Sequence, residues 1–87
     1  MNASEQQSRE DDLLLARQFG QVFVRELNQP RIRADFDRLF KGDREALEQF
    51  EFGVVEEDQK RLTMGLSRTE FHAYHVKKGT AHGHGRV

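Results

Sequence analysis

The sequence predicts an all-α fold, a compact bundle of four or five short helices. Leu, Glu, Arg and Gln, which favour helices, are frequent, whereas β-branched residues are few and there is a single Pro. Apolar side chains recur three and four residues apart along most of the chain, as they do on one face of a helix. Residues that typically cap helices stand between these periodic stretches, so we expect helices joined by short turns.

The chain has the length of one domain, which we expect to span residues 10–78. Residues 1–9 are mainly polar and are expected to form a disordered N-terminus. Residues 79–87 are rich in Gly and His and carry too little apolar surface to pack. For that stretch we expect a flexible C-terminal His/Gly tail.

The composition argues against several classes of protein. Fourteen basic and fifteen acidic residues give no overall field that would attract nucleic acid. No apolar run approaches the ~20 residues of a membrane span, and the N-terminus lacks the basic and apolar segments of a signal peptide. With no Cys there are no disulfides. We therefore expect a cytoplasmic protein that binds neither nucleic acid nor membranes.

The first helix is expected to begin at the acidic residues 10–12, whose charge suits the positive end of a helix, and to run to Leu27. Leu14 and a few other apolar residues lie off the centre of its apolar stripe. The helix is therefore either a central core helix covered on two sides, or one whose spare face binds a partner. The stripe itself matches an amphipathic template at Leu15, Phe19, Val22 and Phe23.

Pro30, after the polar Asn28, predicts the start of a second helix, which Gly42 ends. Asp43 predicts the N-cap of a third helix, because its carboxylate can accept from the next backbone N–H groups. Gly53 is expected to end that helix in the left-handed conformation. A short further helix would then follow, with Val54 and Val55 re-entering the core, acidic residues at 56–58 in its first turn, and Leu62 as its inward residue.

The last helix has the clearest signals. Ser67 and Glu70 have the spacing of a capping box, in which each side chain bonds to the backbone N–H of the other residue. Lys77 and Lys78 suit the negative end of a helix, and Gly79 is expected to stop it.

The stretch from residue 40 to residue 64 contains no obvious nucleophile or general base, and its pattern indicates packing and binding. Nothing in the chain resembles a Ser-His-Asp set, a P-loop or a dinucleotide motif, so we do not expect the chain alone to be an enzyme. The candidate residues are apolar and would contact a partner protein: Leu14, Phe23, Phe50, Phe52, Phe71 and Tyr74.

Histidine is the only residue type that suggests metal chemistry. His72 and His75 are three residues apart on the last helix and could share a metal, and His82 and His84 in the tail could bind Cu(II) or Ni(II) loosely. With no Cys and no carboxylate near the tail, we predict no physiological metal site. Adventitious binding and simple solvated histidines remain the alternatives.

The pattern Phe40-Lys41-Gly42-Asp43-x-x-Ala46-Leu47-x-x-Phe50, with two acids and Gln59-Lys60-x-Leu62 after it, resembles the small helical subunit of protocatechuate 4,5-dioxygenase and its relatives. The similarity covers roughly residues 15–65, and the family's Gly-Gly-Asn segment is missing after Met64. The resemblance implies a helical small subunit of an extradiol dioxygenase, in aromatic compound catabolism. Its larger catalytic subunit would hold Fe(II) and carry out the chemistry.

A helical part followed by the segment 79–87 also resembles the leader portion of split borosin precursors, although the tail has few Val or Ile residues. This second resemblance implies a ribosomally made precursor peptide. Its helical leader would be recognised by a methyltransferase that modifies backbone nitrogens of the C-terminal tail.

Overall fold

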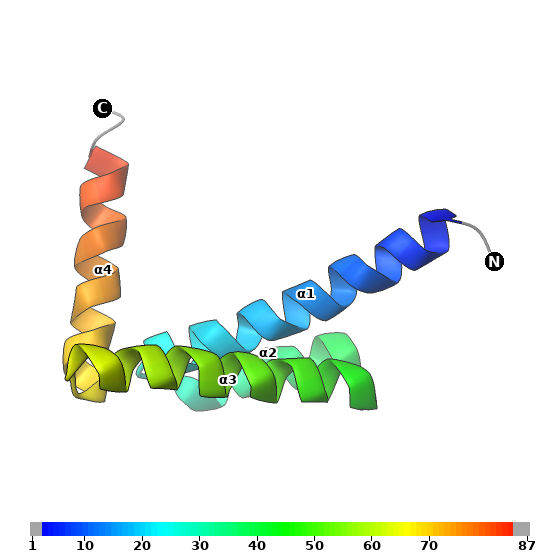
Figure 1. Cartoon of the computed structure of the whole chain (residues 1–87), viewed down its shortest axis with the longest axis horizontal. Coiled ribbons are helices and arrows are strands. Elements are labelled where there is room, and N and C mark those ends of the chain that lie inside the picture. Colours follow the sequence, from blue (N-terminus) through cyan, green and yellow to red (C-terminus); the bar gives the residue numbers. More distant parts are fainter. Residues whose placement is uncertain (1–2, 85–87) are drawn as a thin grey trace.

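The structure, a computed structural model, describes the backbone of residues 3–84 and the side chains of residues 6–79. The described residues form four α-helices and no strand, which confirms the predicted all-α fold. In chain order the helices are α1 (Ala3–Arg25), α2 (Gln29–Phe40), α3 (Arg44–Met64) and α4 (Arg68–His84) (Figure 1).

Helices α1, α2 and α3 form the body of the molecule, and α4 stands up from one end of it (Figure 1). The main interface is between α1 and α3, with α2 packed against α1. The N-terminal end of α1 and the far end of α4 both point away from this body, which is reflected in extents of 44 × 30 × 23 Å.

The core is an aromatic cluster between the three body helices. Phe36 of α2 and Phe50 of α3 are both buried, with ring centroids 4.5 Å apart. Phe23 of α1 meets the ring of Phe50 edge to face at 5.6 Å, an arrangement that adds to the benefit of apolar burial. Small buried residues complete the cluster, namely Ala16 on α1 and Ala46 on α3.

Two glycines allow α1 and α3 to approach each other closely. A Cβ atom at Gly20 would lie 2.0 Å from the carbonyl oxygen of Phe50, and one at Gly53 would lie 2.1 Å from that of Arg17. Both distances are far below van der Waals contact, so only residues without side chains fit at this crossing. The expectation that Gly53 ends a helix was wrong. Gly53 lies inside α3, and its role is to admit the backbone of α1.

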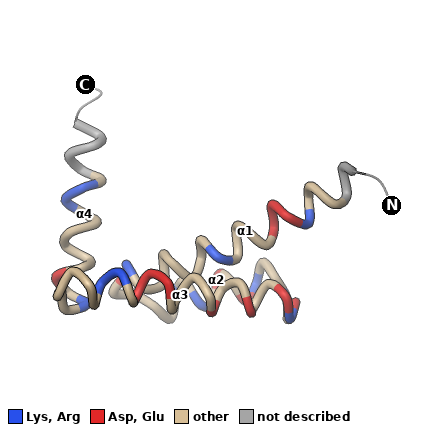
Figure 2. The backbone as a smooth tube through the Cα atoms, viewed as in Figure 1, with Lys and Arg blue, Asp and Glu red and all other residues tan. Residues whose placement is uncertain are grey.

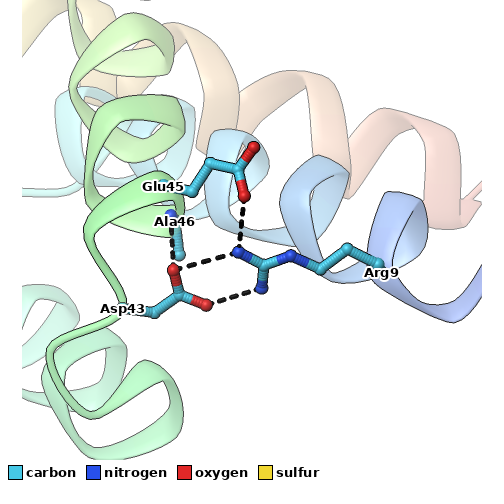
Figure 3. A network of polar contacts seen from close by, with 4 residues as sticks. All are labelled: Arg9, Asp43, Glu45 and Ala46. Atoms are coloured by element: carbon cyan, nitrogen blue, oxygen red, sulfur yellow. Dashed lines mark hydrogen bonds and ion pairs between the residues drawn. The ribbon is translucent and has the colours of Figure 1, made fainter. Parts of the chain in front are cut away.

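An ion-pair network ties the first turns of α1 to the start of α3 (Figure 3). The guanidinium of Arg9 donates to both carboxylate oxygens of Asp43, at 2.5 and 3.1 Å, and to Glu45 at 2.8 Å. Asp43 also accepts from the backbone N–H of Ala46 at 3.2 Å, which confirms it as the N-cap of α3. The hydrogen bonds from Arg9 and then from Ala46 lower the pKa of Asp43 to about 2.

Replacing Arg9 by Gln should raise the pKa of Asp43 from about 2 toward its ordinary 3.8. Since the folded pKa of Asp43 is depressed, the stability it contributes is present above pH 3.8 and is lost as the pH falls through about 2. In Arg9→Gln this acid-dependent loss should be smaller. A carboxyl NMR titration and urea unfolding at several pH values measure both effects. A parent Asp43 that titrates at the ordinary value would contradict the network.

Two boundaries differ from the expected ones. Helix α1 begins at Ala3 rather than after residue 9, and the anchoring of Arg9 to α3 explains order in a segment with few apolar residues. Helix α4 continues to His84, past Gly79. Gly79 does not have the positive φ of a helix-ending glycine, in contrast to Gly65 after α3, where φ is 73°. The remainder of the expected tail, residues 85–87, lies outside the described residues, as do residues 1–2.

The predicted capping box of α4 is confirmed. Ser67 Oγ accepts from the Glu70 backbone N–H at 3.1 Å, and Glu70 accepts from the Ser67 N–H at 2.8 Å. Replacing Ser67 by Ala should therefore lower the free energy of unfolding by ~1 kcal/mol, measured from urea midpoints. Ser67→Asn, which keeps a capping side chain, serves as the control and should cost much less.

Candidate functional site

Helix α3 carries apolar side chains on two opposite faces. Its inner face, at Ala46, Phe50, Gly53 and Glu57, is buried in the body of the molecule. On the opposite face Phe52, Val55 and Leu62 are 56%, 68% and 56% exposed. Their spacings of three and seven residues place them in one row along the helix, the spacing of a helix–helix contact. We call this row, with its neighbours Glu48, Glu51 and Gln59, the α3 outer face.

Acidic side chains surround the centre of the α3 outer face. Phe52 and Val55 lie in a shallow, mainly apolar hollow whose remaining walls are Glu48, Glu51, Glu56 and Gln59. Glu48 and Glu51 are exposed and come from the N-terminal half of α3, where acidic positions are frequent (Figure 2). The hollow therefore combines apolar contact area with a negative rim.

Arg17 of α1 fixes one edge of this surface. Its guanidinium lies 4.7 Å from the centroid of the Phe52 ring, a cation–π contact. The same group donates to both carboxylate oxygens of Glu56, with Nε at 3.0 Å from Oε1. This pairing raises the pKa of Arg17 and lowers that of Glu56. Because Arg17 contacts both Glu56 and Phe52, it supports the Phe52 ring in the free chain.

The exposed surface continues onto α1 through Leu14. This side chain lines a hollow between α1 and α3, together with Arg17 and Gln21 of α1 and Glu56 and Lys60 of α3. Leu14 is exposed, and the polar side chains of Arg17, Gln21, Glu56 and Lys60 surround it in this hollow.

The six predicted partner-binding residues divide into two groups. Leu14, Phe52 and Tyr74 are exposed, as a contact with a partner requires. Phe50 and Phe71, in contrast, are fully enclosed in the chain's own packing, and Phe23 is half-buried against Phe50. Phe50 and Phe71 are thus corrected to core residues. Helix α2 packs against the ring of Phe50, and the ring of Phe71 anchors α4 to the body.

Sequence reasoning placed Val55 and Leu62 in the core, and both lie outside. The error came from ending the helix at Gly53, which reset the register of everything after it. When residues 44–64 are treated as one continuous helix, a row with alternating spacings of three and four residues becomes visible: Phe52, Val55, Gln59 and Leu62. That spacing was the available signal for a second apolar face.

A second polar cluster lies where α4 joins the body. The side chain of Glu57 is only 4% exposed, and its Oε2 accepts from Arg25 Nε at 2.5 Å. His75 Nε2 of α4 lies 3.5 Å from the same oxygen and is buried without a hydrogen-bond partner among the described groups. Burial lowers the pKa of His75, and the charge of Arg25 lowers it further, against the opposing effect of Glu57.

The two histidines of α4 face different partners. His72 Nδ1 lies 3.0 Å from the backbone oxygen of Arg25, while His75 faces Glu57. Among the described side chains, no group of three or more His, Asp or Glu residues is placed to hold a metal ion. The side chains of His82 and His84 lie outside the described part of the chain. For His72 and His75, the geometry indicates a structural role at the junction.

Comparison with known proteins gave no relative: no family model, no curated protein and no solved structure matches this chain. Among the described residues, no helix has both the length and the apolar character that crossing a membrane requires.

Proposed function

We propose that this chain is a non-catalytic small subunit or accessory binding module that docks on a larger catalytic subunit through the α3 outer face. The observation that carries the proposal is the exposure of Phe52, Val55 and Leu62 in one row. A row of large apolar side chains left in water costs solvation free energy, which contact with a partner recovers at ~25 cal/mol per Å² of apolar area removed from water. Such a row is a typical protein-binding surface.

The charges around the row indicate what kind of surface a partner would present. Glu48 and Glu51 flank the hollow and are exposed, whereas Glu56 is already paired with Arg17. A complementary surface is an apolar helix face or groove flanked by Lys or Arg, since opposite charges at the rim guide association and register. Phe52, supported by Arg17, is the expected anchor, because aromatic side chains commonly dominate binding energy.

The resemblance in residues 40–62 gives this general role a specific form, the small subunit of an extradiol aromatic ring-cleavage dioxygenase. In that form, Fe(II) and the reacting groups belong to the larger subunit. The helical body presents the α3 outer face to that subunit and contributes no catalytic residue.

Reconstitution tests this form of the proposal. The larger subunit, which we expect to be encoded beside this chain, would be purified alone, loaded with Fe(II), and mixed with this chain in increasing amounts. We expect a defined complex in size-exclusion chromatography and a ring-cleavage rate that rises until the chain is stoichiometric. Ring cleavage by this chain alone with Fe(II), or a large subunit indifferent to the chain, would overturn it.

The borosin-type precursor is the second candidate, and the direction of α4 favours it. Helix α4 carries the C-terminal end away from the body formed by α1, α2 and α3, where a modifying enzyme could reach it (Figure 1). Coexpression with a neighbouring methyltransferase and mass spectrometry of the tail distinguishes the two candidates. Mass increases of whole methyl groups within residues 79–87 support the precursor. A tail that stays unmodified, in a chain that forms a stable complex with the larger catalytic subunit, supports the small subunit.

A further inference from the structure

Helix α4 is held to the body by a small contact. It follows α3 through a turn at Gly65, whose φ of 73° is left-handed, and it packs chiefly against the C-terminal part of α1. Among its described side chains, those of residues 68–79, only Phe71 is fully buried, and its ring meets that of His75 at 4.5 Å. From Val76 to Gly79 the helix is exposed, and Figure 1 shows it leaving the body. The position of α4 therefore depends on the first two turns.

The polar part of this contact has a titratable group at its centre. His75 Nε2 is buried, lies 3.5 Å from Glu57 Oε2, and has no hydrogen-bond partner within the part of the chain that the structure describes. The carboxylate it faces is already paired with Arg25 at 2.5 Å. The titratable and charged groups around His75 are Arg25 and Glu26 on α1, Glu57 and Lys60 on α3, and His72, Tyr74 and Lys78 on α4.

We propose that α4 is a pH-sensitive arm, docked while His75 is neutral and released from the body when His75 is protonated. A neutral imidazole fits a buried position beside a carboxylate that Arg25 has already neutralised. An imidazolium in the same place would lose most of its hydration beside three cations, Arg25, Lys60 and Lys78. The Glu57 carboxylate, which Arg25 shares, and Glu26 would offset this only in part. In the released state the same imidazolium is solvated, so protonation favours release.

The pH dependence of α4 docking follows from the thermodynamic linkage between docking and protonation of His75. The pKa of docked His75 lies below its ordinary 6.5, so docking is fully favoured above pH 6.5. The preference is lost as the pH falls through the lower, docked-state value. Protonation of one histidine thus changes the shape of the whole module, because release frees the turn at Gly65 and uncovers Phe71.

Distance measurements on spin-labelled protein test this proposal, and the absence of Cys makes specific labelling simple. Labels would be placed at Gln18→Cys on α1 and Lys77→Cys on α4, both exposed and outside the cluster. At about pH 7.5 we expect one narrow distance distribution, and at about pH 5 a second population with longer, broader distances, since histidine titrates in this interval.

His75→Gln, added to the labelled protein, should remove this pH response, and the matched variant His72→Gln should retain it. An NMR titration of the unsubstituted protein gives an independent readout, in which the His75 ring titrates below 6.5 together with the amide signals of residues 71–76. The proposal fails if the distances are the same at both pH values, if His75→Gln responds as the parent does, or if His75 titrates at or above 6.5. Should His75→Gln disturb folding, the NMR titration alone decides.

Discussion

Replacing Phe50 by Ala is expected to lower the free energy of unfolding by about 3–5 kcal/mol, the range for large aromatic side chains removed from a core. Phe50 is 2% exposed, and its ring contacts those of Phe36 and Phe23, so that all three body helices meet at this side chain. In a chain of 87 residues there is little other apolar packing to close the resulting cavity. Urea unfolding followed by circular dichroism measures the loss.

Phe52→Ala is the matched control, since it removes the same side chain two residues further along the same helix. Phe52 is 56% exposed and its ring contacts the guanidinium of Arg17, so the expected loss is below ~1 kcal/mol. If Phe52→Ala proved the more destabilising of the two, the assignment of inner and outer faces of α3 would be reversed.

Replacing Gly53 by Ala is expected to lower the free energy of unfolding by about 2–3 kcal/mol, in the upper part of the ~1–3 kcal/mol typical of overpacking. The new Cβ would lie 2.1 Å from the Arg17 carbonyl oxygen and 3.3 Å from the Gln21 nitrogen. Both are backbone atoms, so α1 and α3 would have to move apart. This cost must exceed the ~1 kcal/mol that Ala normally gains over Gly within a helix.

Gly79→Ala provides the control with the opposite sign. A Cβ at Gly79 meets nothing within 4 Å, and the residue lies within α4 without a positive φ. Helicity should rise, and with it the stability of α4, by up to ~1 kcal/mol. Circular dichroism and thermal melting of both variants give the comparison. A tolerated Gly53→Ala would contradict the close crossing of α1 and α3, and a harmful Gly79→Ala would restore Gly79 as a helix stop.

The sequence was sufficient for the features that depend on local interactions. The caps at Asp43 and at Ser67 with Glu70 form between residues three positions apart, so composition and spacing predict them well. The all-α fold follows from the same local preferences together with the apolar period. The buried aromatic residues Phe36 and Phe50 follow that period, although Phe50 was assigned to a partner contact.

Local sequence signals could not predict the features that depend on packing between helices. Gly53 has the local signature of a helix end, and only the backbone of α1 against it explains a glycine inside α3. The charge of Glu57 suggested the first turn of a further helix, yet its side chain is buried in the middle of α3, where Arg25 of α1 and His75 of α4 face it. For the same reason, the outward position of Val55 was missed once the helix was divided at Gly53.

We infer that the α3 outer face is a docking surface and is not needed by the fold. Val55→Asp tests it most directly, because Val55 is 68% exposed and lies at the centre of the row, while its neighbour Val54 packs against the core. We expect Val55→Asp to leave the free energy of unfolding within ~0.5 kcal/mol of the parent. It should nevertheless abolish the complex with the larger subunit in size-exclusion chromatography, whereas Val54→Asp should destabilise the chain itself. A Val55→Asp chain that still forms the complex, or that unfolds as readily as Val54→Asp, would contradict the claim.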